Sequence, residues 1–473
     1  MFMRYFKLPY IIYRDYPDFG YLTDNRNFGY DTAAESCIKV GDRILSKTGS
    51  VFYSLLSETP QSAEDLARKI ATIFVGATLE EIENDAEVFY GGLADDGFIG
   101  CIEKSSKVCY FSYSNVTPLA LPNEGTKNES GSDYYEKWGA EYHLSRVHLE
   151  VSSRCNEHCE HCYFPNHYQR DLMSQELFLR ILEQCKAANV LSITISGGEP
   201  MLNPNLLFFI DECRKNNFSI NLLSNLTLTT DDFVDVFANT PLLSIQTSLY
   251  SMNADVHDAI TKVPGSFQKT KRVIEVLHQH NVPLQINCPI MRQNKDSYRS
   301  VLNWAKALNI MATSDYMLFG CFDGTKENLS CRLDMPEIEA IIREERQLEA
   351  SERNMKQKSE HEFAGRDYAI CPVCISSICI SHNGDVYPCE GWQSYKLGNL
   401  KDSTLIQIWE NSPKIQELRN LTYGDFPKCK SCLDKDFCSI CLLRNANESP
   451  NGNFRDTNSF FCKVAHLKRS IST

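Results

Sequence analysis

The sequence predicts an α/β protein: an incomplete (β/α) barrel, preceded by a small α+β module and followed by a cysteine-rich domain. Three observations support this fold class. Apolar runs alternate with amphipathic helices between residues 144 and about 320. Three cysteines lie within eight residues directly after the first of these runs, and nine more lie between Cys371 and Cys462. Repeated βα units favour a parallel sheet, and clustered thiols favour bound metal.

Composition narrows the function classes. The formal net charge of −13 argues against a general binder of nucleic acid or of anionic membranes, because phosphate contacts need clustered Lys and Arg. No apolar run reaches the roughly 18–20 residues that cross a bilayer, and the first residues do not resemble a signal peptide. We therefore expect a cytoplasmic protein. Reducing cytosol disfavours disulfides, so the 20 cysteines indicate metal rather than cross-links.

Residues 1–105 are predicted to form a winged-helix-like α+β module. Strand-like stretches cover 11–16, 21–25 and 43–47, and helical patterns cover 49–58, 62–74 and 78–98. Ser62 is placed to cap the second helix, and Thr78 with Glu81 forms a capping box on the third. A polar linker, residues 106–140, follows.

Residues 141–325 are predicted to form a partial (β/α)6, TIM-like barrel, whose chemistry lies at the carboxyl ends of the strands. The six strands are predicted at 146–152, 191–197, 219–225, 243–250, 284–291 and 311–320. The charged segment 326–366 reads as a solvated helical connector, and residues 367–473 are cysteine-rich and turn-rich.

The first cysteine group, Cys155, Cys159 and Cys162, follows the first barrel strand. Soft thiolates select iron–sulfur clusters, zinc or Cu(I). A structural zinc site has four protein ligands, whereas three thiolates on a cube-shaped [4Fe–4S] cluster leave one iron open for a substrate. A zinc loop is the alternative.

This CxxxCxxC motif resembles that of the radical S-adenosylmethionine (SAM) enzymes, which cleave SAM to a 5′-deoxyadenosyl radical. Companion segments at the ends of later strands strengthen the resemblance: 196–200 (SGGEP), 222–225, 246–251 and 286–291. Many relatives carry Asp-Gly where Tyr250 and Ser251 stand here. The resemblance implies SAM contacts from a set of residues in these segments: Tyr163, Gly197, Gly198, Glu199, Ser224, Asn225, Ser248 and Asn287. No other catalytic residue is assigned.

The later cysteines resemble the SPASM domain, which holds two auxiliary [4Fe–4S] clusters, making three clusters in all. The resemblance implies one ligand set of Cys371, Cys374, Cys389 and Cys441, and a second of Cys429, Cys432, Cys438 and Cys462. The last spacing is two residues where relatives usually have three, and zinc ribbons are the alternative. Cys379 is left over. A two-residue turn at Asn383-Gly384 would put Ile378 opposite Cys389, so that Cys379 faces away from Cys389.

The N-terminal module resembles the peptide-recognition element of ribosomal peptide maturases, which bind a leader peptide along a sheet edge. Together the resemblances imply a maturase that forms a thioether crosslink in a precursor peptide and takes electrons from a flavodoxin or ferredoxin. Carbon–carbon crosslinking, epimerisation, small-molecule modification and sulfatase activation are the enzymatic alternatives. An iron–sulfur redox sensor is the non-enzymatic one.

Overall fold

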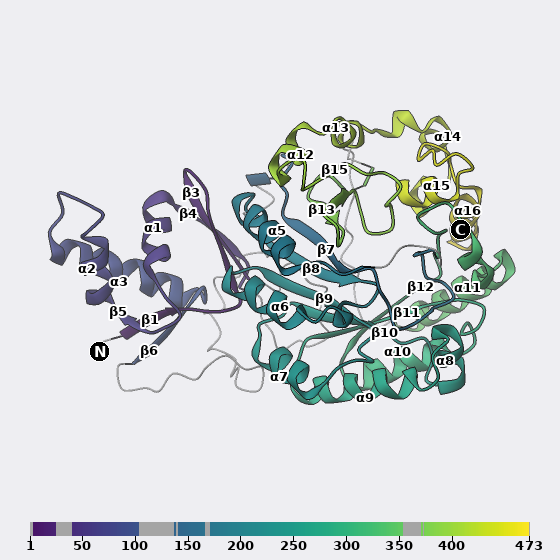
Figure 1. Cartoon of the computed structure of the whole chain (residues 1–473), viewed down its shortest axis with the longest axis horizontal. Helices are drawn as coiled ribbons and strands as arrows, with labels where there is room; N and C mark the ends of the chain where they lie inside the picture. Colours follow the sequence, from purple (N-terminus) through teal and green to yellow (C-terminus); the bar gives the residue numbers. More distant parts are fainter. Residues whose placement is uncertain are drawn as a thin grey trace.

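The structure, a computed structural model, describes residues 3–24, 40–103, 137–138, 141–165, 171–352, 370–371 and 373–472. Most of the predicted linker, the last third of the predicted connector (residues 353–366), Cys37 and Cys109 lie outside these residues. Figure 1 shows the N-terminal module at one end, the barrel in the middle and the C-terminal domain beside it. No helix of the described residues is long and apolar enough to cross a membrane.

A nine-stranded sheet forms the middle of the molecule, in the order β12-β11-β10-β9-β8-β7-β13-β14-β15. The six predicted barrel strands lie side by side in chain order and pair in parallel, so the predicted open, partial barrel is confirmed. These strands are β7 (Arg146–Ser152), β8 (Ser192–Gly197), β9 (Ser219–Leu223), β10 (Ser244–Ser248), β11 (Leu284–Pro289) and β12 (Met311–Asp315). The helices between them are α5 (Gln175–Ala187), η2 (Pro200–Leu202), α6 (Leu206–Lys215), α7 (Asp231–Asn239), α8 (Ala254–Thr261), α9 (Ser266–Gln279) and α10 (Tyr298–Ala307).

The two faces of this sheet differ in polarity. Val147, Leu149 and Val151 of β7 are buried in the apolar core beneath the helices. Because strand neighbours point to opposite faces, His148 and Glu150 face the other side, which we call the inner face. The same alternation gives polar inner residues on the later strands, which is unusual for a barrel interior filled only by packing.

The C-terminal domain extends the same sheet. β13 pairs in parallel with β7, with Cys379 beside His148. The elements after β12 are η3 (Glu327–Cys331), α11 (Met335–Glu352), β13 (Ser377–Ile380), β14 (Asp385–Tyr387), β15 (Gly398–Asn399), α12 (Leu405–Asn411), α13 (Pro413–Arg419), η4 (Tyr423–Asp425), α14 (Pro427–Lys430), η5 (Lys435–Phe437), α15 (Leu442–Glu448) and α16 (Ser459–Ser472). The predicted connector is partly buried, since Ile338 of α11 is inaccessible to solvent.

The predicted hairpin register is wrong by one residue. Cys379 lies opposite Tyr387, so the turn has three residues rather than two. Gly384 adopts a φ of 86° that favours glycine, and Asn383 Oδ1 accepts a hydrogen bond from the Asp385 N–H at 3.1 Å. Cys389 lies two residues after Tyr387, the partner of Cys379. Cys379 and Cys389 therefore point to the same side of the sheet, which is the opposite of the prediction.

The N-terminal module contains two three-stranded antiparallel sheets, β5-β1-β6 and β2-β3-β4. The predicted strand-like stretches became β2 (Ile11–Asp15), β3 (Phe19–Asp24) and β4 (Asp42–Ser46), whereas β1 (Met3–Lys7), β5 (Gln61–Ser62) and β6 (Ile99–Glu103) were missed. The helices are α1 (Lys47–Leu55), α2 (Ala63–Ile70) and α3 (Leu79–Asp95). The Ser62 cap and the Thr78–Glu81 capping box are both present.

The module docks on the barrel at the amino ends of the strands. Asn217, two residues before β9, accepts from the Tyr13 N–H at 2.7 Å and donates to the Ile11 carbonyl at 3.0 Å. Arg14 is buried and its Nε donates to the Val190 carbonyl at 2.8 Å, just before β8. The module therefore lies at the end of the barrel opposite the cysteine loop.

Candidate active site

The cysteine loop lies directly against the segment that follows β8. The Gly198 N–H donates to the Ser152 carbonyl at 2.7 Å, and the Glu199 N–H donates to the Arg154 carbonyl at 2.7 Å. A β-carbon on Gly198 would lie 2.4 Å from the Arg154 oxygen, and one on Gly197, whose φ is 142°, would lie 1.9 Å from the Ser152 oxygen. Only glycine permits this approach.

Glu199 holds the ends of β8 and β9 together. It is fully buried. Its Oε1 accepts from the Met201 N–H at 2.9 Å and the Ser224 hydroxyl at 2.8 Å, and its Oε2 accepts from the Asn225 N–H at 2.8 Å. Burial raises the pKa of Glu199 to about 7, although these three hydrogen bonds lower it. Glu199, one of the predicted SAM contacts, thus has both carboxylate oxygens engaged within the chain.

Asn156 and Thr227, which sequence reasoning missed, connect the cysteine loop to the end of β9. Asn225 Nδ2 donates to Asn156 Oδ1 at 2.9 Å, and Asn156 Nδ2 donates to the Thr227 hydroxyl at 2.7 Å. Asn156 directly follows Cys155, so its position in the loop was the available signal. The predicted contact residue Asn225 therefore also positions the loop.

Tyr250, where the sequence departs from many relatives, packs against the loop. Its hydroxyl lies 3.9 Å from Cys159 Sγ and 3.4 Å from His161 Nε2. Ser248, two residues before Tyr250, ends β10, and its Cα pairs with that of Asn287 on β11. The departure therefore places an aromatic side chain beside the second cysteine.

A row of polar side chains crosses the inner face. Asn221 Nδ2 donates to the Thr194 hydroxyl at 3.5 Å, Gln246 Nε2 to Asn221 Oδ1 at 3.4 Å, and Asn287 Nδ2 to Gln246 Oε1 at 3.4 Å. The Thr313 hydroxyl donates to Asn287 Oδ1 at 2.9 Å. These five strands thus offer amide and hydroxyl groups to a polar ligand, and only Asn287 was predicted from the sequence.

Glu150 is a further inner-face group that sequence reasoning missed. It is 1% exposed, its Oε2 accepts from Gln393 Nε2 at 2.6 Å, and its Oε1 has no partner among the described residues. Burial, and then the charge of Glu390, raise the pKa of Glu150 to about 8. The Tyr163 phenol and the Cys379 thiol lie close enough for Glu150 to raise the pKa of each, after burial.

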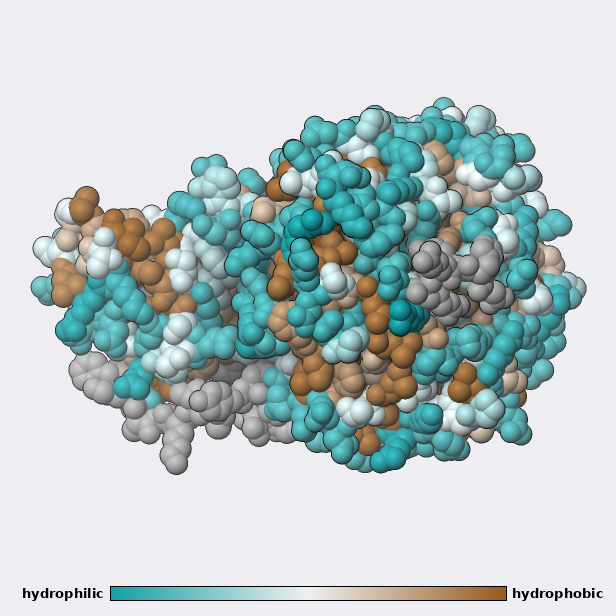
Figure 2. All heavy atoms as spheres, in the orientation of Figure 1, coloured by the Kyte–Doolittle hydropathy of each residue, from teal (hydrophilic) through white to brown (hydrophobic). Residues whose placement is uncertain are grey.

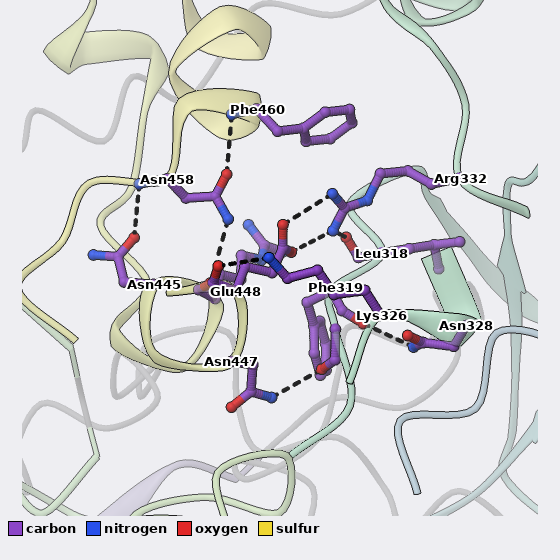
Figure 3. A network of polar contacts seen from close by, with 12 residues as sticks. Leu318, Phe319, Lys326, Asn328, Arg332, Asn445, Asn447, Glu448, Asn458 and Phe460 are labelled. Atoms are coloured by element: carbon purple, nitrogen blue, oxygen red, sulfur yellow. Dashed lines mark hydrogen bonds and ion pairs between the residues drawn. The ribbon is translucent and has the colours of Figure 1, made fainter. Parts of the chain in front are cut away.

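A buried polar network joins the last barrel loop to the C-terminal domain (Figure 3). Arg332 donates to both carboxylate oxygens of Glu448, at 3.0 Å for Nη1 and Oε2, and both side chains are 9% exposed. Asn447 Nδ2 donates to the Gly320 carbonyl at 2.9 Å. Since Asn447 and Glu448 lie on α15, which begins directly after Cys441, the network fixes that cysteine against the barrel.

The same barrel loop, residues 316–334, also holds the cysteine loop. Asn328 Nδ2 donates to the His161 carbonyl at 3.3 Å, and the Phe322 N–H donates to the Tyr163 carbonyl at 3.2 Å. One loop thus contacts both cysteine-bearing regions.

Thiols of the first predicted C-terminal set lie close enough to influence one another's pKa. Burial, and then the charges of Glu390, Cys441 and Cys371, raise the pKa of the Cys389 thiol well above its ordinary value. Burial raises the pKa of the Cys374 thiol to about 12. The positive charge of Arg419 lowers this pKa, and the charge of Cys371 raises it. Cys389 also lies near Cys379, so this set borders the inner face.

Thiols of the second predicted set influence one another's pKa in the same way. Burial, and then the charges of Cys462, Cys429 and Cys432, raise the pKa of the Cys438 thiol. Cys429, Cys438 and Cys462 line one surface hollow. All described cysteines are free thiols.

The residue types of these three sets fit iron–sulfur clusters, because cysteine thiolates are the usual ligands of such clusters. Without a metal, burial raises the pKa of Cys155 to about 12 and that of Cys159 well above its ordinary value. A coordinated thiol is deprotonated by the metal.

Comparison with known proteins agrees with this geometry. Residues 149–305 match the radical SAM superfamily, and residues 371–433 match SPASM, an iron–sulfur cluster-binding domain. The chain is 24% identical to the AdoMet-dependent heme synthase of Methanosarcina barkeri, over 62% of this chain and 90% of that one. It is 24% identical to the antilisterial bacteriocin subtilosin biosynthesis protein AlbA of Bacillus subtilis, over 64% and 68%.

Solved structures share the fold. Streptococcus suis SuiB bound to precursor peptide SuiA has a TM-score of 0.59 at 14% identity and covers 97% of this chain and 99% of its own. The enzyme anSMEcpe with bound AdoMet has a TM-score of 0.56 at 18% identity, over 69% and 96%. The fold and domains therefore define a radical SAM/SPASM enzyme. Its cofactors are SAM and [4Fe–4S] clusters.

Proposed function

We propose that this enzyme is a peptide maturase that forms a thioether between a cysteine sulfur and a carbon of a ribosomally made precursor peptide. The observation that carries the proposal is the N-terminal module joined to the radical SAM and SPASM domains in one chain. SuiB, solved with its precursor peptide, aligns over 97% of this chain, whereas anSMEcpe aligns over 69%. A leader-binding module has no use in an enzyme of small molecules alone.

The outer edge of β4 is the proposed leader site. β4 is the last strand in the sheet order β2-β3-β4 of the described residues, and adding a strand beside such an edge strand is a known mode of peptide recognition. Arg43 of β4 pairs with Asp96 at the end of α3, and Ile44 is exposed. Figure 2 shows hydrophobic residues gathered over the helices of this module. Val75 and Val88 are two of the exposed apolar side chains in its sequence.

Each group of site residues has its own proposed role. Cys155, Cys159 and Cys162 would hold the SAM-binding cluster, and the two C-terminal sets would hold the auxiliary clusters. When bound, SAM and its cluster supply a radical that removes a hydrogen atom from the substrate, and the auxiliary clusters supply an acceptor for the surplus electron. Gly197 and Gly198 allow the close backbone approach, while Glu199 keeps the strand ends in place.

The inner face is the proposed site of the peptide core. The polar row from Thr194 to Thr313 presents amides and hydroxyls. Because Oε2 of Glu150 accepts from Gln393, Oε1 of the protonated carboxyl offers a buried O–H donor to a substrate carbonyl. The set containing Cys389 borders this face and is our choice for the acceptor of the surplus electron. We further expect a cytoplasmic enzyme, since its thiols must stay reduced, with no nucleic-acid or membrane partner.

The test is anaerobic coexpression with a short cysteine-containing reading frame encoded beside this gene. A thioether predicts a product lighter by two hydrogens per crosslink, whose cysteine resists alkylation. A carbon–carbon crosslink would give the same mass loss with an alkylatable cysteine. Unchanged mass with deuterium taken up at Cα from heavy water would establish epimerisation and reject the thioether.

A second candidate comes from the heme synthases among the relatives. Their match covers 62% of this chain and so leaves more than a third of its length unexplained. Haem production by the purified enzyme, with no change in any peptide, would favour this candidate.

A further inference from the structure

We propose that the surface around Cys462 is the docking site of an acidic electron-transfer protein. This basic surface is defined by the exposed lysines Lys428, Lys430, Lys435 and Lys463. They lie on α14, η5 and α16, at the outer end of the C-terminal domain (Figure 1). The inference rests on the proposed cluster ligands but not on the identity of the peptide substrate.

The first observation is exposure of the second ligand set. Cys462 is exposed, whereas Cys374 of the first set is buried. Cys429, Cys438 and Cys462 line one hollow, together with Cys441 of the first set. Cys462 also lines a second, more open hollow with Lys463 and His466. Because electron tunnelling weakens steeply with distance, the set closest to solvent is the best entry point for an electron from another protein.

The second observation is charge. The chain as a whole carries −13, yet residues 459–472 contain three basic and no acidic side chains. Residues 427–441 contain three lysines and two aspartates. One of these aspartates, Asp434, forms an ion pair with Arg469 and lies 3.5 Å from His466 Nδ1. In the described part of the chain none of the four lysines forms an ion pair.

The third observation is an apolar centre. Leu433, which follows the ligand Cys432, is 77% exposed, and Tyr423 is 40% exposed. Apolar and aromatic groups ringed by charge are the usual anatomy of a protein–protein interface. Figure 2 shows a mainly hydrophilic surface at this end of the molecule, so an exposed leucine beside a ligand is a specific feature.

Together these features fit a small acidic redox protein. Opposite charge steers the two proteins together and raises the association rate. In the transfer itself one electron leaves the reduced cofactor of the donor and enters the oxidised cluster of the second set. The donor is oxidised by one electron and the cluster reduced by one, with no bond made or broken.

The experiment uses the anaerobic holoenzyme and a reduced flavodoxin of net negative charge. The variant Lys428→Glu/Lys430→Glu/Lys463→Glu is compared with Lys69→Glu/Lys269→Glu/Lys401→Glu, which makes the same charge change at exposed lysines elsewhere. Stopped-flow absorbance measures cluster reduction by flavodoxin. At low salt we expect the rate of cluster reduction to fall at least about tenfold in the first variant and to stay within about twofold of wild type in the control. The wild-type rate should fall as added salt screens the charges.

Dithionite separates docking from cluster integrity. Iron content and dithionite-driven SAM cleavage should match wild type in both variants, and Leu433→Ala should weaken flavodoxin binding without changing the net charge. Unchanged reduction by flavodoxin in the first variant, or an equal loss in the control, would overturn the proposal. So would loss of dithionite-driven activity, which would assign the lysines to cluster assembly. Selective loss of RNA or anionic-vesicle binding, with flavodoxin unaffected, would assign the surface to those partners instead.

Discussion

At the level of single residues, the missing side chain of Gly198 decides how closely the SGGEP segment can approach the cysteine loop. Gly198→Ala should therefore displace the loop, because the new β-carbon would lie 2.4 Å from the Arg154 backbone oxygen. We expect at least about a tenfold loss of SAM cleavage with dithionite. Gly92→Ala, in the middle of α3 with nothing within 4 Å, is the control and should raise stability by about 0.5–1 kcal/mol. Equal activity in both variants would reject the steric account.

The loop thiols give the second prediction. Changing Cys155, Cys159 and Cys162 together to Ala should remove about four irons per chain, one cubane's worth, and abolish 5′-deoxyadenosine formation. Cys185→Ala, at a buried thiol of α5, should keep its iron. Continued 5′-deoxyadenosine production by the triple variant would exclude the ligand assignment.

Glu150 gives a pH prediction. Its pKa is raised to about 8 by burial, against about 4.3 when exposed, so the native state holds a proton that the unfolded chain releases. The stability from this carboxyl is fully present below about pH 4.3 and is lost as pH rises to about 8. Thermal unfolding between pH 5.5 and 8.5 should show a decline of up to a few kcal/mol that Glu150→Gln abolishes. Parallel pH profiles in the two proteins would contradict this.

Single residues with strong local rules were predictable from sequence. The Ser62 cap and the Thr78–Glu81 box need only the residues themselves, and both are present. Glu150 was not predictable, because a lone Glu in an apolar strand does not reveal which partners surround it. Its burial depends on Gln393, 243 residues later in the chain.

At the level of elements, the Arg332–Glu448 pair holds α15 against the last barrel loop. Arg332→Ala leaves a buried carboxylate unpaired, which costs about 3–5 kcal/mol. We expect a lower melting temperature and faster proteolysis of the C-terminal domain. Arg343→Ala breaks a solvent-exposed pair with Glu339 and should cost about 0.5 kcal/mol or less. Similar losses in the two variants would show that the pair has no special role.

Element order was predictable, whereas register was not. Alternation of apolar residues marks each barrel strand, and all six were found. The β13–β14 turn was misplaced by one residue because two-residue and three-residue turns share the Asn-Gly signal. The side-chain bond from Asn383 that favours the longer turn is visible only in the structure.

At the level of the whole molecule, the N-terminal module, which is the proposed leader site, and the cysteine loop lie at opposite ends of the barrel. Deleting residues 1–105 should leave dithionite-driven SAM cleavage within about twofold of wild type and stop modification of the full-length precursor. Mass spectrometry of the peptide and chromatography of 5′-deoxyadenosine measure the two outcomes. Undiminished peptide turnover would exclude the module as the leader site.

The position of the module also sets a minimum length for the substrate. Asn217 and Val190 anchor it at the amino ends of β8 and β9, while Cys155 follows the carboxyl end of β7. Six residues of β8 alone span about 20 Å at 3.3 Å per residue. A leader held at the module would act as a tether that raises the local concentration of the core at the opposite end, and only if its spacer exceeds this span. Precursors with a shorter spacer would bind as well and react far less.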